Sequence, residues 1–204
     1  MDLTSMTNHI LQQVPAILIP TASDGELVRR YQGFFKKHED TVIRGFYDLV
    51  YSDPATRQHL DPKERPMREN TLRQWYQVTT TGHFDEHYWA WQALVGIVHV
   101  KHKIPNPAML GMWSWMINFI QKGLLEELPA NEALDVIQVF QKLQATVCSL
   151  IVESYIMTQQ EAIHRASGLN QAIMGRFIHI EIDRLLGQGR AILQEKVQQA
   201  AMAA

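Results

Sequence analysis

Residues 85–103 read DEHYWAWQALVGIVHVKHK and carry the clearest structural signal in the chain. Their apolar residues recur at intervals of three and four, which predicts a helix from Asp85 to the prolines that follow at 105 and 107. Tyr88, Gln92 and Val95 precede His99 by eleven, seven and four residues, so they share its helix face. We therefore expect His99 on an apolar face near the end of this helix.

The same periodicity continues through most of the 204 residues, and no run alternates with period two for long enough to predict a strand. Ser23 and Glu26 have the spacing of a capping box at the start of a helix. Gly168 is expected to interrupt a helix of eight or more turns that begins at Asn131. The other helices are expected over residues 42–52, 64–80, 107–122 and from Leu169 onward. The sequence therefore predicts an all-α fold.

Composition sets the broad class of protein. With 46% apolar and 20% charged residues, the chain resembles ordinary globular proteins. A net charge of −2 gives no field to hold nucleic acid or an anionic membrane, and the longest apolar segment, Ala108 to Ile120, is too short to span a bilayer. The single cysteine, Cys148, excludes an intramolecular disulfide. These features favour a cytoplasmic protein with neither nucleic acid nor membrane as a partner.

Tryptophan and histidine cluster around His99. All five tryptophans and four of the nine histidines lie between Trp75 and Trp115. Such rings suit a planar aromatic cofactor, although a tryptophan-rich core with surface histidines explains the same cluster. One nitrogen of His99 can reach a metal ion while the other donates to the Val95 carbonyl, as in haem proteins. A buried core histidine is the alternative.

Other candidate sites have weaker support. His83 and His87 are one helical turn apart, but the chain has no HExxH pattern for zinc. Glu161 and His164 form half of a di-iron carboxylate signature, with no second copy. Cys148 lies within an apolar stripe, as expected of a core residue rather than a nucleophile.

From about Gly25 to Ile156 the chain resembles the sensor-globin family, which comprises protoglobins and the haem domains of globin-coupled sensors. The matching motifs, in chain order, are Phe46-Tyr47-Asp48-Leu49, Trp75-Tyr76, Gly82-His83-Phe84-Asp85, Tyr88, Val95-Gly96-Ile97-Val98-His99 and Trp113. The resemblance implies a globin fold of the sensor-globin type with an additional C-terminal helix. It divides the chain into an N-terminal extension (1–22), a haem domain (23–165) and a C-terminal helix and tail (166–204).

The resemblance also implies residue roles. It makes His99 the proximal ligand of the iron of haem b, and it makes Tyr47 the distal hydrogen-bond donor to bound gas. Thr71 is a second, weaker polar candidate on the distal side. The remaining implied cofactor-binding residues are apolar: Phe46, Met67, Leu72, Trp75 and Val95. The chain departs from the pattern at two places: Gln92 stands where many members carry arginine, and Lys103-Ile104-Pro105 replaces the glycine common just after the proximal helix.

The function implied is that of a haem-binding sensor globin. It would bind O2 reversibly, with NO and CO as further ligands, and would signal to a downstream partner through a homodimer built on the two helices after His99. A gas-binding module without an output domain is favoured over an enzyme. A haem-free regulatory domain and a haem-dependent NO dioxygenase or peroxidase remain alternatives.

Overall fold

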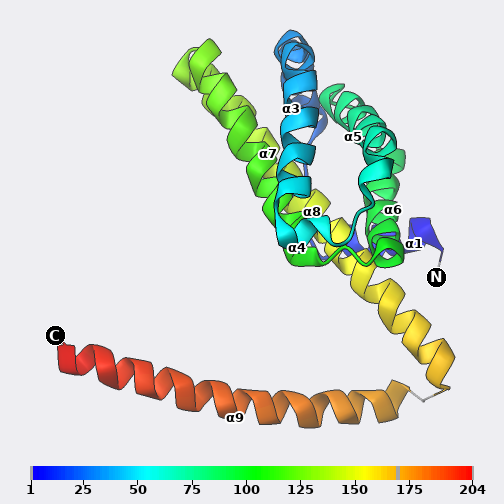
Figure 1. Cartoon of the computed structure of the whole chain (residues 1–204), viewed down its shortest axis with the longest axis vertical. Coiled ribbons are helices and arrows are strands. Elements are labelled where there is room, and N and C mark those ends of the chain that lie inside the picture. The colour runs from blue at the N-terminus through cyan, green and yellow to red at the C-terminus, as the bar shows by residue number, and fades with distance from the viewer. Residues whose placement is uncertain (1, 169–170, 204) are drawn as a thin grey trace. The chain divides into compact units, whose positions relative to one another are not determined.

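The computed structural model describes residues 2–168 and 171–203, and these contain helices and no strand. The predicted all-α fold is therefore confirmed (Figure 1). The helices, in chain order, are α1 (Leu3–Leu11), η1 (Ala16–Leu18), α2 (Ala22–Arg30), α3 (Gln32–Ser52), α4 (Pro54–Arg57), η2 (Pro62–Glu64), α5 (Arg65–Thr80), α6 (Glu86–His102), α7 (Asn106–Glu127), α8 (Ala130–Ser167) and α9 (Gln171–Ala203).

Most helix ends follow from local sequence. Asp85 caps α6 by accepting a hydrogen bond from the backbone N–H of Tyr88, and α8 ends before Gly168, whose φ is +63°. The capping box of α2 was predicted at the wrong residues: Thr21 and Asp24 form it, three positions apart, rather than Ser23 and Glu26. Leu169, the predicted start of the last helix, lies outside the described residues.

The chain divides into two compact units, Met1–Thr158 and Gln159–Ala204. In the first unit, α3 packs against both α5 and α7 (Figure 1). Its buried side chains Phe35, Val42 and Ile43 enter the core, where the Phe35 ring lies 5.1 Å from that of Phe140 on α8. These side chains therefore anchor α3 to the core of the unit.

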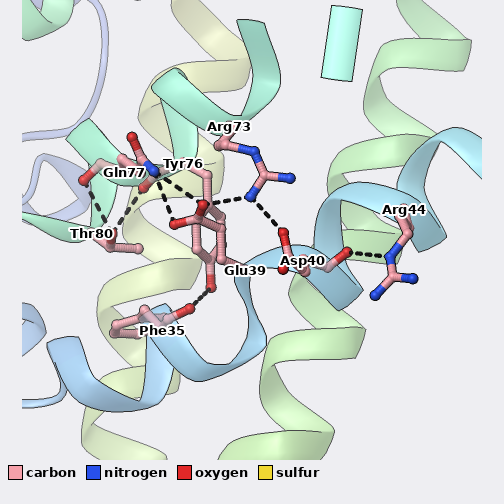
Figure 2. A network of polar contacts seen from close by, with 8 residues as sticks. All are labelled: Phe35, Glu39, Asp40, Arg44, Arg73, Tyr76, Gln77 and Thr80. Atoms are coloured by element: carbon pink, nitrogen blue, oxygen red, sulfur yellow. Dashed lines mark hydrogen bonds and ion pairs between the residues drawn. The ribbon is translucent and has the colours of Figure 1, made fainter. Parts of the chain in front are cut away.

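A polar network joins α3 to α5 (Figure 2). Arg73 on α5 donates to Glu39 at 2.6 Å and to Asp40 at 2.7 Å, both on α3. Gln77 also donates to Glu39, and the buried Tyr76 hydroxyl donates to the Phe35 carbonyl at 3.0 Å. The Tyr76 hydroxyl is the buried donor of this network, and since buried polar groups are costly unless paired, its bond to Phe35 sets the register of α5 along α3. The ion pairs of Arg73 are partly exposed to solvent and contribute little.

Helix α6 packs closely against its neighbours. A Cβ at Gly96 would lie 2.1 Å from Oγ of Ser154 and 2.3 Å from the carbonyl oxygen of Ile151, so only glycine lets α6 approach α8 this closely. On another side, α1 contacts α6 and buries Met6 and Ile10. The predicted N-terminal extension therefore packs on the helix that carries His99.

The second unit, Gln159–Ala204, contains the end of α8 and the helix α9. The additional C-terminal helix is thus confirmed. Phe177, Ile180 and Val197 on α9 each have at least 65% of their surface exposed. Across the described residues of both units, no helix is long and apolar enough to cross a membrane.

Candidate functional site

A cavity of about 370 Å³ opens within the first unit, a size typical of small-molecule sites. Helices α3, α5, α6 and α7 supply most of its walls, and Ile151 of α8 contributes as well. The lining is predominantly apolar, and several of its members are methionines or tryptophans. The cavity therefore suits a largely apolar ligand.

The cavity brings together every candidate cofactor-binding residue named from the sequence. They reach it from α3, α5 and α6, and they are Phe46, Tyr47, Met67, Thr71, Leu72, Trp75, Val95 and His99. Met67, at 60% exposed, lies at the rim, as do Leu94 and Val98 of α6. The geometry thus joins residues that are up to 53 positions apart in the sequence, from Phe46 to His99.

His99 lines the cavity near the end of α6. Burial lowers the pKa of His99 to about 4, and the charges of His102 and Arg68 add to this effect. The imidazole is therefore neutral near pH 7, which is the form that binds metals. The expected bond from its second nitrogen to the Val95 carbonyl is absent, because the buried Nδ1 has no partner among the described residues.

The segment after His99 turns sharply. Lys103 caps α6 with a left-handed backbone, φ 55°, and its N–H bonds back to the last turn of the helix. This conformation costs a non-glycine residue about 1 kcal/mol. Lys103, in the segment 103–105 where the resemblance implies a glycine, therefore adopts a backbone conformation that glycine would favour.

Tyr47 projects from α3 into the same cavity, and its hydroxyl donates to the Arg68 carbonyl on α5 at 3.0 Å. Burial raises the pKa of Tyr47 above its usual value, so the phenol keeps its proton. Thr71 also lines the cavity, but its hydroxyl donates to the carbonyl of Met67 at 3.1 Å within α5. Both hydroxyls therefore have backbone acceptors in this structure.

Gln92 does not line the cavity, although it shares a helix with His99. It is fully buried, accepts a hydrogen bond from Nε1 of Trp75 at 2.9 Å, and donates to the Tyr88 carbonyl at 3.2 Å. The Trp75 ring meets that of Trp113 edge to face at 5.3 Å. Gln92 thus joins α6 to α5 and fixes the tryptophan in the cavity wall.

Sequence reasoning missed several lining residues. Arg68 and His59 add basic groups, and α7 contributes Met109, Met112 and Met116. The methionines show only the ordinary spacing of a core helix, so their role depends on where α7 crosses the cavity. Arg68 lies one residue after Met67, and its position beside Tyr47 depends on the pairing of α3 with α5.

Known proteins resemble this chain in sequence pattern and in fold. The family model described as Protoglobin matches residues 8–161. The globin domain of the Geobacter sulfurreducens globin-coupled sensor superposes with a TM-score of 0.62 at 19% identity, covering 66% of this chain and 90% of that one. The globin domain of E. coli DosC, in a ferric form, gives 0.55 at 12%, covering 74% and 97%. No curated protein matches.

The two structural likenesses confirm the predicted globin fold of the sensor type, and the family match covers most of the first compact unit. The chain therefore belongs to the protoglobin family.

Proposed function

We propose that this protein binds haem b through His99 and acts as a reversible sensor of O2, with NO and CO as further ligands. The observation that carries the proposal is the state of His99: a neutral imidazole with an unpaired buried nitrogen, in the wall of an apolar cavity. The unpaired Nδ1 costs about 1–3 kcal/mol in this structure. A bond from Nε2 to iron would orient the ring so that Nδ1 can donate to a backbone carbonyl, as in other metal-bound histidines.

The surroundings of His99 fit haem better than a protein-only metal site. Among the described residues, no group of three or more His, Cys, Asp or Glu side chains is placed to hold a metal ion. A porphyrin supplies the other metal ligands itself, so a single histidine suffices. The aromatic rings of Trp75, Trp91 and Trp113 and the methionines of α7 offer apolar contact for its faces.

When bound, haem supplies an iron that coordinates a diatomic gas. The chain then contributes three things. His99 holds the iron from α6, the apolar lining excludes water, and the Tyr47 hydroxyl offers a hydrogen bond to a polarised ligand. To do so, Tyr47 must release the Arg68 carbonyl, which links gas binding to α5.

The proposal includes a homodimer, through which α7 and α8 carry the signal onward. Leu125 at the end of α7 and Leu134 at the start of α8 are 46% and 52% exposed, and a second copy would cover them. Gly96 brings α6 against α8 at Ile151 and Ser154, so a shift of the His99 helix would press on the proposed dimer helix.

Absorption spectroscopy tests the haem site. Protein produced with sufficient haem should show an intense Soret band, which shifts reversibly when O2 is added to the ferrous form. His99→Ala should lose most of its haem, because the only proposed protein bond to iron is gone. His87→Ala, an exposed histidine on the same helix, is the matched control and should keep its haem. Normal haem content in His99→Ala would contradict the assignment.

A further inference from the structure

The charged side chains that line the cavity have one sign. Among the described residues that line it, Arg68, His59, His99 and His102 are basic and none is acidic. The permanent charge among them belongs to Arg68, because the guanidinium of arginine is not deprotonated in proteins. An apolar cavity with a fixed positive charge and no negative one favours a ligand that is apolar in its body and anionic at one end.

The hydrogen bonds of Arg68 to Glu64 hold its side chain in place, but they do not use all of its N–H donors. Its side chain is only 13% exposed, and its Nε and Nη2 donate to the same oxygen of Glu64, at 3.1 Å and 2.6 Å. A guanidinium has five N–H donors, so the bond pattern with Glu64 leaves three for another acceptor. Glu64 itself is 42% exposed and does not line the cavity.

The family resemblance implies an arginine at position 92 that could pair with an anionic group of the ligand, and this chain lacks it. The arginine implied at position 92 is a glutamine here, and Gln92 is fully buried and does not line the cavity. Its amide is already paired with Trp75 and Tyr88. An anionic group on a cavity ligand must therefore find its cation elsewhere in the lining.

We propose that Arg68 binds a carboxylate of the cavity ligand, which is a haem propionate if the proposed function holds, and that Glu64 competes for the same guanidinium. The inference rests on the proposed haem site and adds a specific anchor to it. A carboxylate would accept from the free N–H groups of Arg68, as arginine–carboxylate pairs do. Before the ligand binds, Glu64 holds the guanidinium in one orientation. Its carboxylate also neutralises part of the positive charge of Arg68, which weakens the attraction for a ligand carboxylate.

The test compares two ligands that differ only in their carboxylates. Haem and haem dimethyl ester are titrated into haem-free protein, and binding is followed by absorbance and by quenching of tryptophan fluorescence. Arg68→Met should weaken haem binding about tenfold or more, as expected for a hydrogen-bonded charged group, and should leave ester binding unchanged. The Tyr47 bond survives in this variant because it is made to the backbone of residue 68.

A second variant separates binding from structural support. Glu64→Gln should strengthen haem binding, since Arg68 loses its competitor, and should again leave the ester unaffected. If Glu64→Gln weakens haem binding as Arg68→Met does, the pair is structural and the inference is wrong. Arg73→Met is the control, because Arg73 pairs with Glu39 and Asp40 outside the cavity. It should bind both ligands as the wild type does.

The remaining outcomes are distinct. Equal losses of haem and ester binding in Arg68→Met overturn the carboxylate contact. Unchanged haem binding in that variant, with normal haem loading of the wild type, overturns the inference alone. A wild-type protein that binds neither ligand overturns the proposed haem site together with the inference.

Discussion

The Tyr47 hydroxyl has one proton to donate and two competing acceptors. In this structure it donates to the Arg68 carbonyl at 3.0 Å, whereas the proposed function requires it to donate to bound gas. Exchange of one hydrogen bond for another changes the free energy only by their difference. Selectivity at this residue therefore depends on how much more strongly a polarised ligand attracts the proton than a peptide carbonyl does.

Replacement of Tyr47 by phenylalanine measures that difference. Tyr47→Phe should raise the O2 dissociation rate roughly fivefold, as loss of about 1 kcal/mol implies, because the phenyl ring keeps the shape but cannot donate. Carbon monoxide, a less polarised ligand, should dissociate at nearly the wild-type rate. Stopped-flow displacement of each gas gives both rates.

Tyr51→Phe is the control at the residue scale. Tyr51 lies one turn further along α3 and donates to the Asp61 carbonyl at 3.2 Å, but it does not line the cavity. Its substitution should leave both gas dissociation rates unchanged. Identical O2 rates in Tyr47→Phe and the wild type would exclude Tyr47 as the distal donor.

At the scale of elements, the contact between α6 and α8 leaves no room for a larger residue at Gly96. Gly96 lies three residues before His99, and its Cα faces Ile151 and Ser154 of α8. Ile151 also lines the cavity, so the helix crossing and the ligand site share a wall. Any change in the spacing of these two helices must alter the position of His99 relative to the cavity.

Gly96→Ala should therefore destabilise the protein by about 1–3 kcal/mol, as overpacking of a core does, and should lower haem retention. Gly96→Ala combined with Ser154→Ala should recover only part of the loss, because the Ile151 carbonyl is also in the way at 2.3 Å. Urea unfolding of the haem-free protein and the haem-to-protein ratio provide the two measurements.

Gly111→Ala is the matched control for this prediction. Gly111 lies within α7, and an added Cβ there meets nothing within 4 Å. Alanine is the better helix former, so this variant should be slightly more stable than the wild type. If Gly96→Ala behaves in the same way, the close approach of α6 and α8 does not matter for stability.

The elements themselves were largely predictable from sequence, whereas the contacts between them were not. Periodicity and the prolines set the limits of α6, and Gly168 sets the end of α8. The missed Arg68 shows the limit of such reasoning, since a helix pattern says nothing about which residue of α5 meets Tyr47. The misplaced capping box shows another, because Thr21 and Ser23 both offer a hydroxyl and only the bonds made distinguish them.

At the scale of the whole molecule, the proposed homodimer gives a prediction about mass in solution. Leu134→Glu should raise the dimer dissociation constant about tenfold or more, because it replaces an apolar contact worth about 1.5–3 kcal/mol with a charge. Sedimentation velocity over a concentration series measures the constant.

The matched control for the dimer is Ile17→Glu. Ile17 is 78% exposed on η1, so the change is chemically similar but lies off α7 and α8. It should leave the dissociation constant unchanged. A wild-type protein that stays monomeric at every concentration would exclude the dimer, and equal effects of the two variants would place the interface elsewhere.

The bond between Trp75 and Gln92 has a thermodynamic consequence for whatever the cavity binds. One wall is ordered in advance, because Trp75 is fixed by this bond and by its contact with Trp113. Helix α7, which carries Trp113, also supplies three methionines to the lining. Met109, Met112 and Met116 are themselves buried, so both the tryptophans and these methionines lost most of their conformational entropy during folding, and little of it remains to be lost when a ligand binds.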